Sequence, residues 1–258
     1  MNIEKYIQRI QYEDGVNPSL EVLAALQSHH LLNVPFENLD IHYGIKISLD
    51  LDRVYHKIIE RNRGGFCYEL NGLFYELLKQ LGFNVKMISA RVYNDKKQVF
   101  GAEFDHLAII AMIDEVEYLV DVGFGEFAFQ PLEIVLGKVQ EEERGRFVIE
   151  NFDEEYLQVS KINGTEKKVE YIFQKTARLW EDFSAMCYYH QMSSESSFTQ
   201  KRLITRPTEN GRITLTNNTL KVVEKGEIIE RAELNEEDYR QQLWTLFGLD
   251  ERELNIDI

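Results

Sequence analysis

The run Arg63-Gly64-Gly65-Phe66-Cys67 places a cysteine where it could act as a nucleophile. Cys67 stands at the start of the segment with the clearest helical periodicity, and the unpaired N–H groups and dipole of a helix start favour a thiolate. Gly64 and Gly65 would let a second backbone or a ligand approach closely. A lone cysteine can also be a small buried apolar residue, so a catalytic role requires a general base.

His106 and Asp121 could be that base and the acid that orients it. His106 begins an apolar run, and Asp121 lies in a strand-like run, Tyr118 to Val122, where an acid must be hydrogen-bonded to offset its lost hydration. If Asp114-Glu115 is a two-residue hairpin turn, the two side chains lie on one face as diagonal neighbours, about 7 to 8 Å apart between backbones. An odd-length loop or a bulge would put them on opposite faces.

Together, Cys67, His106 and Asp121 would perform thiol acyl transfer. Asp121 would fix the tautomer of His106 and stabilise its protonated form, which in turn would hold Cys67 as a thiolate. The thiolate would attack a thioester to form an acyl-enzyme, and an acceptor amine would attack that intermediate while His106 takes its proton. These three residues predict a class of reaction but no substrate.

The surrounding pattern indicates helices first and strands afterwards. Helices are expected in the first third of the chain, including Leu51 to Arg61, and most clearly at residues 70–81, which Gly82 ends. Beyond Gly82, short strand-like runs joined by charged turns favour an antiparallel barrel or sheet. Thr176 to Met192 is again helix-like, and three more strand-like runs precede a final helix from Asn235 to Phe247.

This order predicts an α+β fold with an N-terminal helical bundle, a central antiparallel β-barrel and a C-terminal α/β unit. A chain of 258 residues is long enough to bury a sizeable apolar core. The expected divisions are residues 1–84 for the bundle with the nucleophile, 85–175 for the barrel with the histidine and aspartate, 176–192 for a connecting helix and 193–258 for the α/β lid.

The net charge of −15 argues against a general role in binding nucleic acid, because phosphates would be repelled over most of the surface. Met1 to Tyr12 lacks the apolar stretch of an export signal. The longest apolar run, Leu107 to Ile113, is far shorter than the roughly 20 residues that span a bilayer. We therefore expect a cytoplasmic protein that is not a membrane protein.

The two cysteines, Cys67 and Cys187, are expected to be thiols in a reducing compartment, with Cys187 in a structural role. His29, His30 and His42 have no cysteine or acid partners at metal-ligand spacing, so no metal is expected. The oligomeric state is left open.

The sequence resembles the arylamine N-acetyltransferase family over essentially its whole length. The most specific mark is the segment Arg63 to Phe74, which contains the Arg-Gly-Gly-Phe-Cys run. The other marks are Val34 to Leu39, His106-Leu107, Asp121 to Gly125, and Ser193 to Arg206 with Phe198 inside it.

The resemblance implies the triad Cys67, His106 and Asp121 on a cysteine-protease-like catalytic core. It also implies ping-pong transfer of an acetyl group from acetyl-coenzyme A to an arylamine, an arylhydroxylamine or a hydrazine, as in xenobiotic metabolism. Gly123 and Gly125 would lie beside coenzyme A. Phe36 and Phe124 would line the acceptor pocket, where flat aromatic walls suit an arylamine.

One residue departs from the family pattern, which often continues Gly-Phe-Gly-Gly: this sequence has Glu126 in the last place. A carboxylate beside a phosphate-rich donor is unfavourable, so donor binding is in question. The alternatives are a Cys-His-Asp amide hydrolase of the peptidase or transglutaminase kind, an amide synthase, and a non-catalytic binding protein of the same fold.

Overall fold

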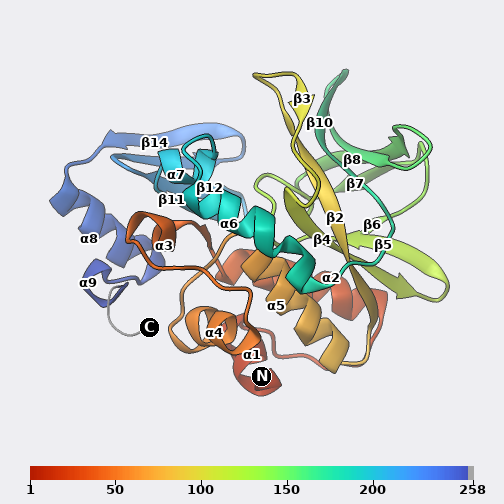
Figure 1. Ribbon diagram of the computed structural model, residues 1–258, viewed down its shortest axis with the longest axis horizontal. Coiled ribbons are helices and arrows are strands. Elements are labelled where there is room, and N and C mark those ends of the chain that lie inside the picture. The colour runs from red at the N-terminus through yellow and green to blue at the C-terminus, as the bar shows by residue number, and fades with distance from the viewer. Residues whose placement is uncertain (255–258) are drawn as a thin grey trace. The chain divides into compact units, whose positions relative to one another are not determined.

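The computed structural model describes residues 1–254, apart from the side chain of Glu253 (Figure 1). These residues form two compact units. The second unit consists of Tyr12–Ser28 and Cys67–Phe183, and it contains all three triad candidates. The first unit consists of Met1–Gln11, His29–Phe66 and the chain from Ser184 onward. The four-segment division expected from the sequence stays a prediction, whereas the α+β class is confirmed.

The second unit is built on an antiparallel sheet that curls into a nearly closed barrel (Figure 1, yellow to green). Its strands run in the order β6-β5-β4-β2-β10-β9-β8-β7, and β3 pairs with β2. The strands are β2 (Asn84–Asn94), β3 (Val99–Phe100), β4 (His106–Ile113), β5 (Val116–Val120), β6 (Leu132–Glu133), β7 (Val139–Glu142), β8 (Gly145–Asn151), β9 (Leu157–Asn163) and β10 (Glu166–Phe173).

Side chains at alternate strand positions form the core of this sheet, because successive residues of a strand point to opposite faces. Ile88 and Ala90 of β2 and Ala108 and Ile110 of β4 all belong to this core. Helix α5 (Cys67–Gln80) packs against β2 and β4. Complete burial of each large apolar side chain stabilises the fold by about 1.5 to 3 kcal/mol.

The hairpin between β4 and β5 has the geometry that the sequence predicts. Asp114 and Glu115 have φ values of +48° and +66°, as a two-residue turn of type I′ requires. Ile113 pairs with Val116, and the ladder continues along the two strands without a shift. The two-residue turn is therefore confirmed, and with it the expected facing of His106 and Asp121.

The first unit contains a second antiparallel sheet in the order β1-β11-β12-β13-β14, with α8 against β12 (Figure 1). Leu215, Leu220, Tyr239 and Leu243 are among its buried core residues. Its elements are α1 (Ile3–Arg9), β1 (Phe36–Glu37), α3 (Leu39–His42), α4 (Leu51–Tyr55), the π-helix η1 (His56–Glu60), α6 (Ser184–Met192), α7 (Ser197–Gln200), β11 (Leu203–Thr208), β12 (Gly211–Thr216), β13 (Thr219–Glu224), β14 (Glu227–Glu233), α8 (Glu236–Phe247) and α9 (Glu251–Leu254).

Helix α2 (Leu20–Asn33) contains the boundary between the units, after Ser28. One helical segment differs from expectation. The helix expected over Thr176 to Met192 is wrong in its first part, because the N–H of Arg178 bonds to the carbonyl of Met87 in β2. Helical structure begins only at the short 3-10 helix η2 (Trp180–Phe183).

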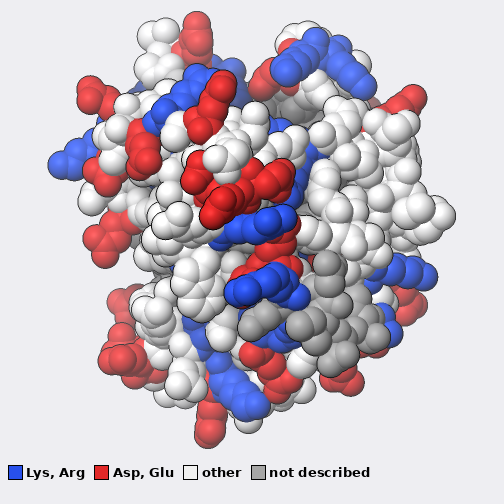
Figure 2. Space-filling view, turned by 90° about the vertical axis from the view of Figure 1, so that its left-hand side faces the viewer, with Lys and Arg blue, Asp and Glu red and all other residues white. Residues whose placement is uncertain are grey.

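One face of the molecule carries acidic and basic side chains interspersed, without a continuous basic surface (Figure 2). Within residues 1–254, we find no helix with both the length and the apolar character needed to cross a membrane.

Candidate active site

His106 and Asp121 are hydrogen-bonded to each other in the interior of the second unit. The Nε2 atom of His106 lies 2.7 Å from Oδ2 of Asp121. The two residues are 2% and 0% exposed, so water competes little for this bond. His106 is the first residue of β4, and Asp121 directly follows β5. The hairpin register therefore accounts for the contact.

Cys67 is the other hydrogen-bonding partner of the imidazole. A side-chain hydrogen bond joins His106 to the Cys67 thiol. Because Asp121 occupies Nε2, the nitrogen left for the thiol is Nδ1. Cys67 is 4% exposed and is the first residue of α5, where a helix start stabilises negative charge. The structure thus brings the three predicted catalytic residues together.

Neighbouring groups hold the imidazole in its protonated form. Burial by itself lowers the pKa of His106, because the imidazolium loses its hydration. The charge and hydrogen bond of Asp121, together with Cys67, outweigh burial and raise that pKa from its ordinary value of 6.5 to about 10. A protonated imidazole therefore lies beside the candidate nucleophile.

Four donors surround the carboxylate of Asp121. Its Oδ2 accepts hydrogen bonds from His106 and from the hydroxyl of Tyr171, at 3.2 Å. Its Oδ1 accepts from the side-chain nitrogen of Asn71 at 2.8 Å and from the N–H of Gly123 at 2.9 Å. These bonds compensate the desolvation of a fully buried charge and fix the orientation of the carboxylate.

The loop after Asp121 approaches the nucleophile closely. A Cβ atom on Gly123 would lie 2.8 Å from the Cα of Cys67 and 2.8 Å from the side-chain nitrogen of Asn71, so only glycine fits there. A Cβ on Gly125 would enter open space, and Glu126 is exposed. Gly123 therefore adjoins the candidate nucleophile, and Gly125 and Glu126 continue the same loop toward solvent.

Aromatic rings line the other side of the imidazole. The ring of Phe124 meets that of His106 edge to face, with 5.3 Å between centroids. Tyr171 lies 5.4 Å from His106 and 5.2 Å from Phe124, again between ring centroids. Phe127 extends this aromatic cluster. Phe124 thus lies against the candidate base, and its expected place in the acceptor pocket stays a prediction.

Phe36 belongs to the first unit, where its ring lies 6.1 Å from that of Phe198 between centroids. Its expected acceptor role stays a prediction.

Close approach of a second backbone explains the two glycines that precede Phe66, Gly64 and Gly65. A Cβ on Gly64 would lie 1.9 Å from the carbonyl oxygen of Pro35, and the carbonyl of Gly65 accepts from the N–H of Glu37 at 2.9 Å.

Arg63 holds the segment before Cys67 through buried ion pairs in the first unit. Its guanidinium lies 2.7 Å from a carboxylate oxygen of Glu37 and 2.5 Å from one of Asp40. Lys57 pairs with Asp40 at 2.8 Å. These ion pairs support a structural role for Arg63.

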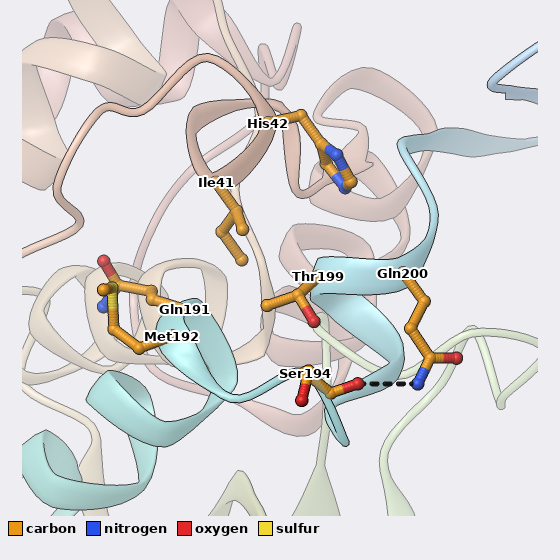
Figure 3. A pocket seen from close by; sticks show the side chains of 7 residues that line it. All are labelled: Ile41, His42, Gln191, Met192, Ser194, Thr199 and Gln200. Atoms are coloured by element: carbon orange, nitrogen blue, oxygen red, sulfur yellow. Dashed lines mark hydrogen bonds between the residues drawn. The ribbon is translucent and has the colours of Figure 1, made fainter.

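A hollow of about 360 Å³ lies elsewhere in the first unit (Figure 3). The side chain of Gln200 donates to the carbonyl of Ser194 at 3.0 Å, and the hydroxyl of Thr199 donates to the carbonyl of Ser193 at 2.7 Å. His42 lies 3.0 Å from the carbonyl of Phe198. These polar groups of the hollow thus form hydrogen bonds within the local structure.

Among residues 1–254, no group of three or more His, Cys, Asp and Glu could hold a metal ion.

Asn71 and Tyr171 were missed by the sequence analysis. Asn71 carries a recognisable signal, because the sequence places an amide one helical turn after Cys67, among the apolar positions of Leu70 and Phe74. Tyr171 carries none: it follows a register shift in β10 between Val169 and Tyr171, which strand periodicity does not reveal.

The chain is similar to known proteins along nearly its whole length. A family model described as N-acetyltransferase matches residues 19–254. The pineal gland arylamine N-acetyltransferase isozyme NAT-10 of Gallus gallus is 34% identical, covering 96% of this chain and 94% of its own. The solved structure of arylamine N-acetyltransferase from Salmonella typhimurium is 25% identical with a TM-score of 0.89, covering 96% of this chain and 90% of that one.

A third relative bears on the candidate triad. The arylamine N-acetyltransferase structure from Bacillus cereus, described as having a unique Cys-His-Glu catalytic triad, is 26% identical with a TM-score of 0.88. The match covers 97% of this chain and 99% of that one. With a matching family model and relatives similar along nearly the whole sequence, the chain belongs to the arylamine N-acetyltransferase family.

Proposed function

We propose that Cys67, His106 and Asp121 are the catalytic triad of this acyltransferase, and that it works by a ping-pong mechanism with acetyl-coenzyme A. The observation that carries the proposal is the position of His106, with Asp121 2.7 Å from Nε2 and Cys67 as its other hydrogen-bonding partner. Such a chain of acid, imidazole and thiol is the arrangement of thiol acyl transfer.

In the first half-reaction, the Cys67 thiolate attacks the carbonyl carbon of acetyl-coenzyme A. A bond forms between that carbon and Sγ, and the bond to the sulfur of coenzyme A breaks. His106, protonated at neutral pH, gives its proton to the departing coenzyme A thiolate. The acetyl group then remains on Cys67 as a thioester.

In the second half-reaction, the acceptor amine attacks the acetyl carbon. His106, now neutral, takes the N–H proton, and the bond from carbon to Sγ breaks. The product is the N-acetylated amine, and the thiolate–imidazolium pair is restored. Asp121 keeps the imidazole in one orientation throughout, because its own carboxylate is held by Tyr171, Asn71 and Gly123.

The donor is expected to lie along the loop that holds Gly123 and Gly125. The tight fit at Gly123 leaves the loop backbone close to Cys67, and the open space at Gly125 would admit a ligand. Phe124, against His106, is proposed to bind the aromatic ring of an arylamine, arylhydroxylamine or hydrazine. The reaction needs Cys67 reduced, which suits the cytoplasm.

The Bacillus cereus relative, described with a Cys-His-Glu catalytic triad, supports the assignment of the third residue. In both chains a carboxylate follows the cysteine and the histidine in the triad. Asp121 has the shorter side chain, and its 2.7 Å contact with His106 supports it as the acid that orients the base here.

Intact-protein mass spectrometry tests the proposal directly. Wild type mixed with acetyl-coenzyme A, without acceptor, should gain one acetyl group, and an aminobenzoate should remove it. Cys67→Ala should gain none. A folded wild type that forms no adduct, or an adduct that persists in Cys67→Ala, would contradict the proposed triad.

A further inference from the structure

The residues just before His106 form a tight turn with an unfavourable backbone conformation. The N–H of Asp105 donates to the carbonyl of Ala102 at 3.2 Å, which closes the turn. Phe104, its third residue, has a φ of +65°. Glycine or asparagine usually occupies this position, because a Cβ is crowded in the left-handed region. A phenylalanine stays there only when its surroundings hold it.

Two buried side chains bond both peptide groups of Phe104. Its N–H donates to Oγ of Ser89 at 2.9 Å. Its carbonyl accepts from the hydroxyl of Tyr68 at 2.7 Å, and the same hydroxyl lies 3.1 Å from the carbonyl oxygen of Asp105. Tyr68 and Ser89 are 0% and 1% exposed, so water cannot readily replace either bond.

Tyr68 is itself held in place. Its ring lies 5.7 Å from that of Phe183 between centroids, and Phe183 also meets the ring of Phe104 edge to face at 5.2 Å. The indole N–H of Trp180 donates to the carbonyl oxygen of Tyr68 at 3.1 Å. A rigid donor can therefore impose its position on the turn.

Tyr68 directly follows the nucleophile in sequence, and the turn it holds directly precedes the base. We propose that the Tyr68 hydroxyl is a positioning group that keeps Phe104 in the left-handed conformation and thereby aligns the His106 imidazole with the Cys67 thiol. This inference rests on the proposed triad. Tyr68 acts through the backbone, so it should affect the rate of acyl transfer more than donor binding.

Removal of the hydroxyl has a defined consequence. In Tyr68→Phe, the ring remains but the carbonyl of Phe104 loses its donor, so the turn can relax toward negative φ and shift the start of β4. We expect the rate of Cys67 acetylation to fall about tenfold, with little change in KM for acetyl-coenzyme A. Ser89→Ala, which removes the other bond to Phe104, should act in the same direction.

Alkylation of Cys67 by iodoacetamide separates alignment from stability. Near pH 6, where His106 is protonated, the alkylation rate should depend on how the imidazolium is aligned with Cys67, so Tyr68→Phe should react about tenfold more slowly. Well above about pH 10, any thiol ionises without help, and the two proteins should react alike. The matched control is Tyr12→Phe, which removes a tyrosine bond to the carbonyl of Gly15 in the same unit and should leave this pH profile unchanged.

Replacing Phe104, the residue with positive φ, by glycine should make acetylation insensitive to the loss of the Tyr68 hydroxyl. Gly adopts positive φ at no steric cost, so the turn no longer needs the hydroxyl. Tyr68→Phe should therefore reduce acetylation at most about twofold in a Phe104→Gly background, compared with about tenfold in wild type. An equal reduction in both backgrounds would contradict the role assigned to Phe104.

The outcomes distinguish this inference from the proposed triad. If wild type forms no acetyl adduct at Cys67, the triad itself is wrong. If wild type is acetylated but Tyr68→Phe and Ser89→Ala keep its rate and alkylation profile, the triad stands and the positioning role is wrong. If Tyr68→Phe has a lower melting temperature but an unchanged alkylation profile, Tyr68 has a structural role only, and the positioning role is again wrong.

Discussion

The side-chain nitrogen of Asn71 lies 2.8 Å from Oδ1 of Asp121. The same nitrogen donates to the carbonyl of Leu107 at 2.7 Å, and the side-chain oxygen accepts from the N–H of Val122 at 2.9 Å. One amide therefore joins the helix of Cys67 to both sides of the hairpin that carries the histidine and the aspartate. A polar side chain with all of these partners buried fixes the relative position of the elements it joins.

Asn71→Asp should test this joint through charge. A second carboxylate beside Asp121 is repelled when both are ionised, so we expect a loss of roughly 2 to 4 kcal/mol in the free energy of unfolding at pH 7. A shared proton would relieve part of that loss at lower pH. Urea unfolding at about pH 7 and pH 5 measures the difference.

Asn71→Ala serves as the uncharged comparison. It leaves the carbonyl of Leu107 and the N–H of Val122 without their partner and should be destabilised at both pH values. If Asn71→Asp loses as much free energy of unfolding at about pH 5 as at about pH 7, the explanation by charge is wrong.

Gly123→Ala should damage the site, and Gly125→Ala is its matched control. The new Cβ at position 123 would lie 2.8 Å from the Cα of Cys67, so the loop must shift, at a cost of about 1 to 3 kcal/mol and with slower acetylation of Cys67. At position 125 the new Cβ has open space. Melting temperature and single-turnover acetylation should separate the two variants, and equal behaviour would contradict the close approach at Gly123.

The protonation of His106 makes the free energy of unfolding depend on pH in the alkaline range. Because its pKa is raised from 6.5 to about 10, the folded protein holds a proton that the unfolded chain releases between those values. This contribution to stability is complete below pH 6.5 and disappears as the pH rises through about 10. The NMR titration of His106 in Cys67→Ala, where thiol ionisation does not overlap, should show a raised pKa, and Asp121→Asn should lower it.

His30 makes the free energy of unfolding depend on pH in the acid range, where stability falls as the pH falls. It is fully buried beside the Tyr6 hydroxyl, 2.9 Å from Nδ1, and burial followed by the charge of Arg9 lowers its pKa from 6.5 to about 3. The unfolded chain binds a proton that the folded protein excludes, so stability falls as the pH drops from 6.5 toward 3. His30→Gln should lose stability less steeply over this range in urea unfolding, and an unchanged slope would contradict the assignment.

Glu126 should weaken the affinity for the anionic donor, on the proposed placement of the donor at the loop. The side chain is exposed, so its repulsion is limited to about 1 kcal/mol. Glu126→Gln should lower KM for acetyl-coenzyme A about two- to fivefold at low salt, and added salt should reduce the difference. Glu143→Gln, also exposed but outside this loop, is the control, and an equal effect of both would leave only net charge as the cause.

Much of the site could be predicted because its geometry follows from local rules. The spacing from Asp114-Glu115 fixes which residues of β4 and β5 share a face, so His106 and Asp121 could be paired from the sequence alone. Apolar periodicity and Gly82 located α5 and its end. Here short-range chemistry and the final structure agree.

The rest depends on contacts that periodicity does not encode. The inward position of Tyr171 follows from an irregularity in β10 at Glu170, where one extra residue changes the register. The two-residue strand β1 exists because it pairs with β11, whose residues lie far along the chain. The segment before Trp180 is extended rather than helical because Arg178 bonds to β2.

The order of the two units along the chain matters during protein synthesis. Every residue of the network around Asp121, from Cys67 to Tyr171, lies before Ser184, where the chain returns to the first unit. As the ribosome releases the chain from its N-terminus, this network is complete while the first unit still lacks α6 to α9 and strands β11 to β14. Translation that stops after Phe183 would thus supply all the hydrogen-bonding groups of the candidate triad but leave the other unit without most of the core cluster that contains Leu215 and Leu243.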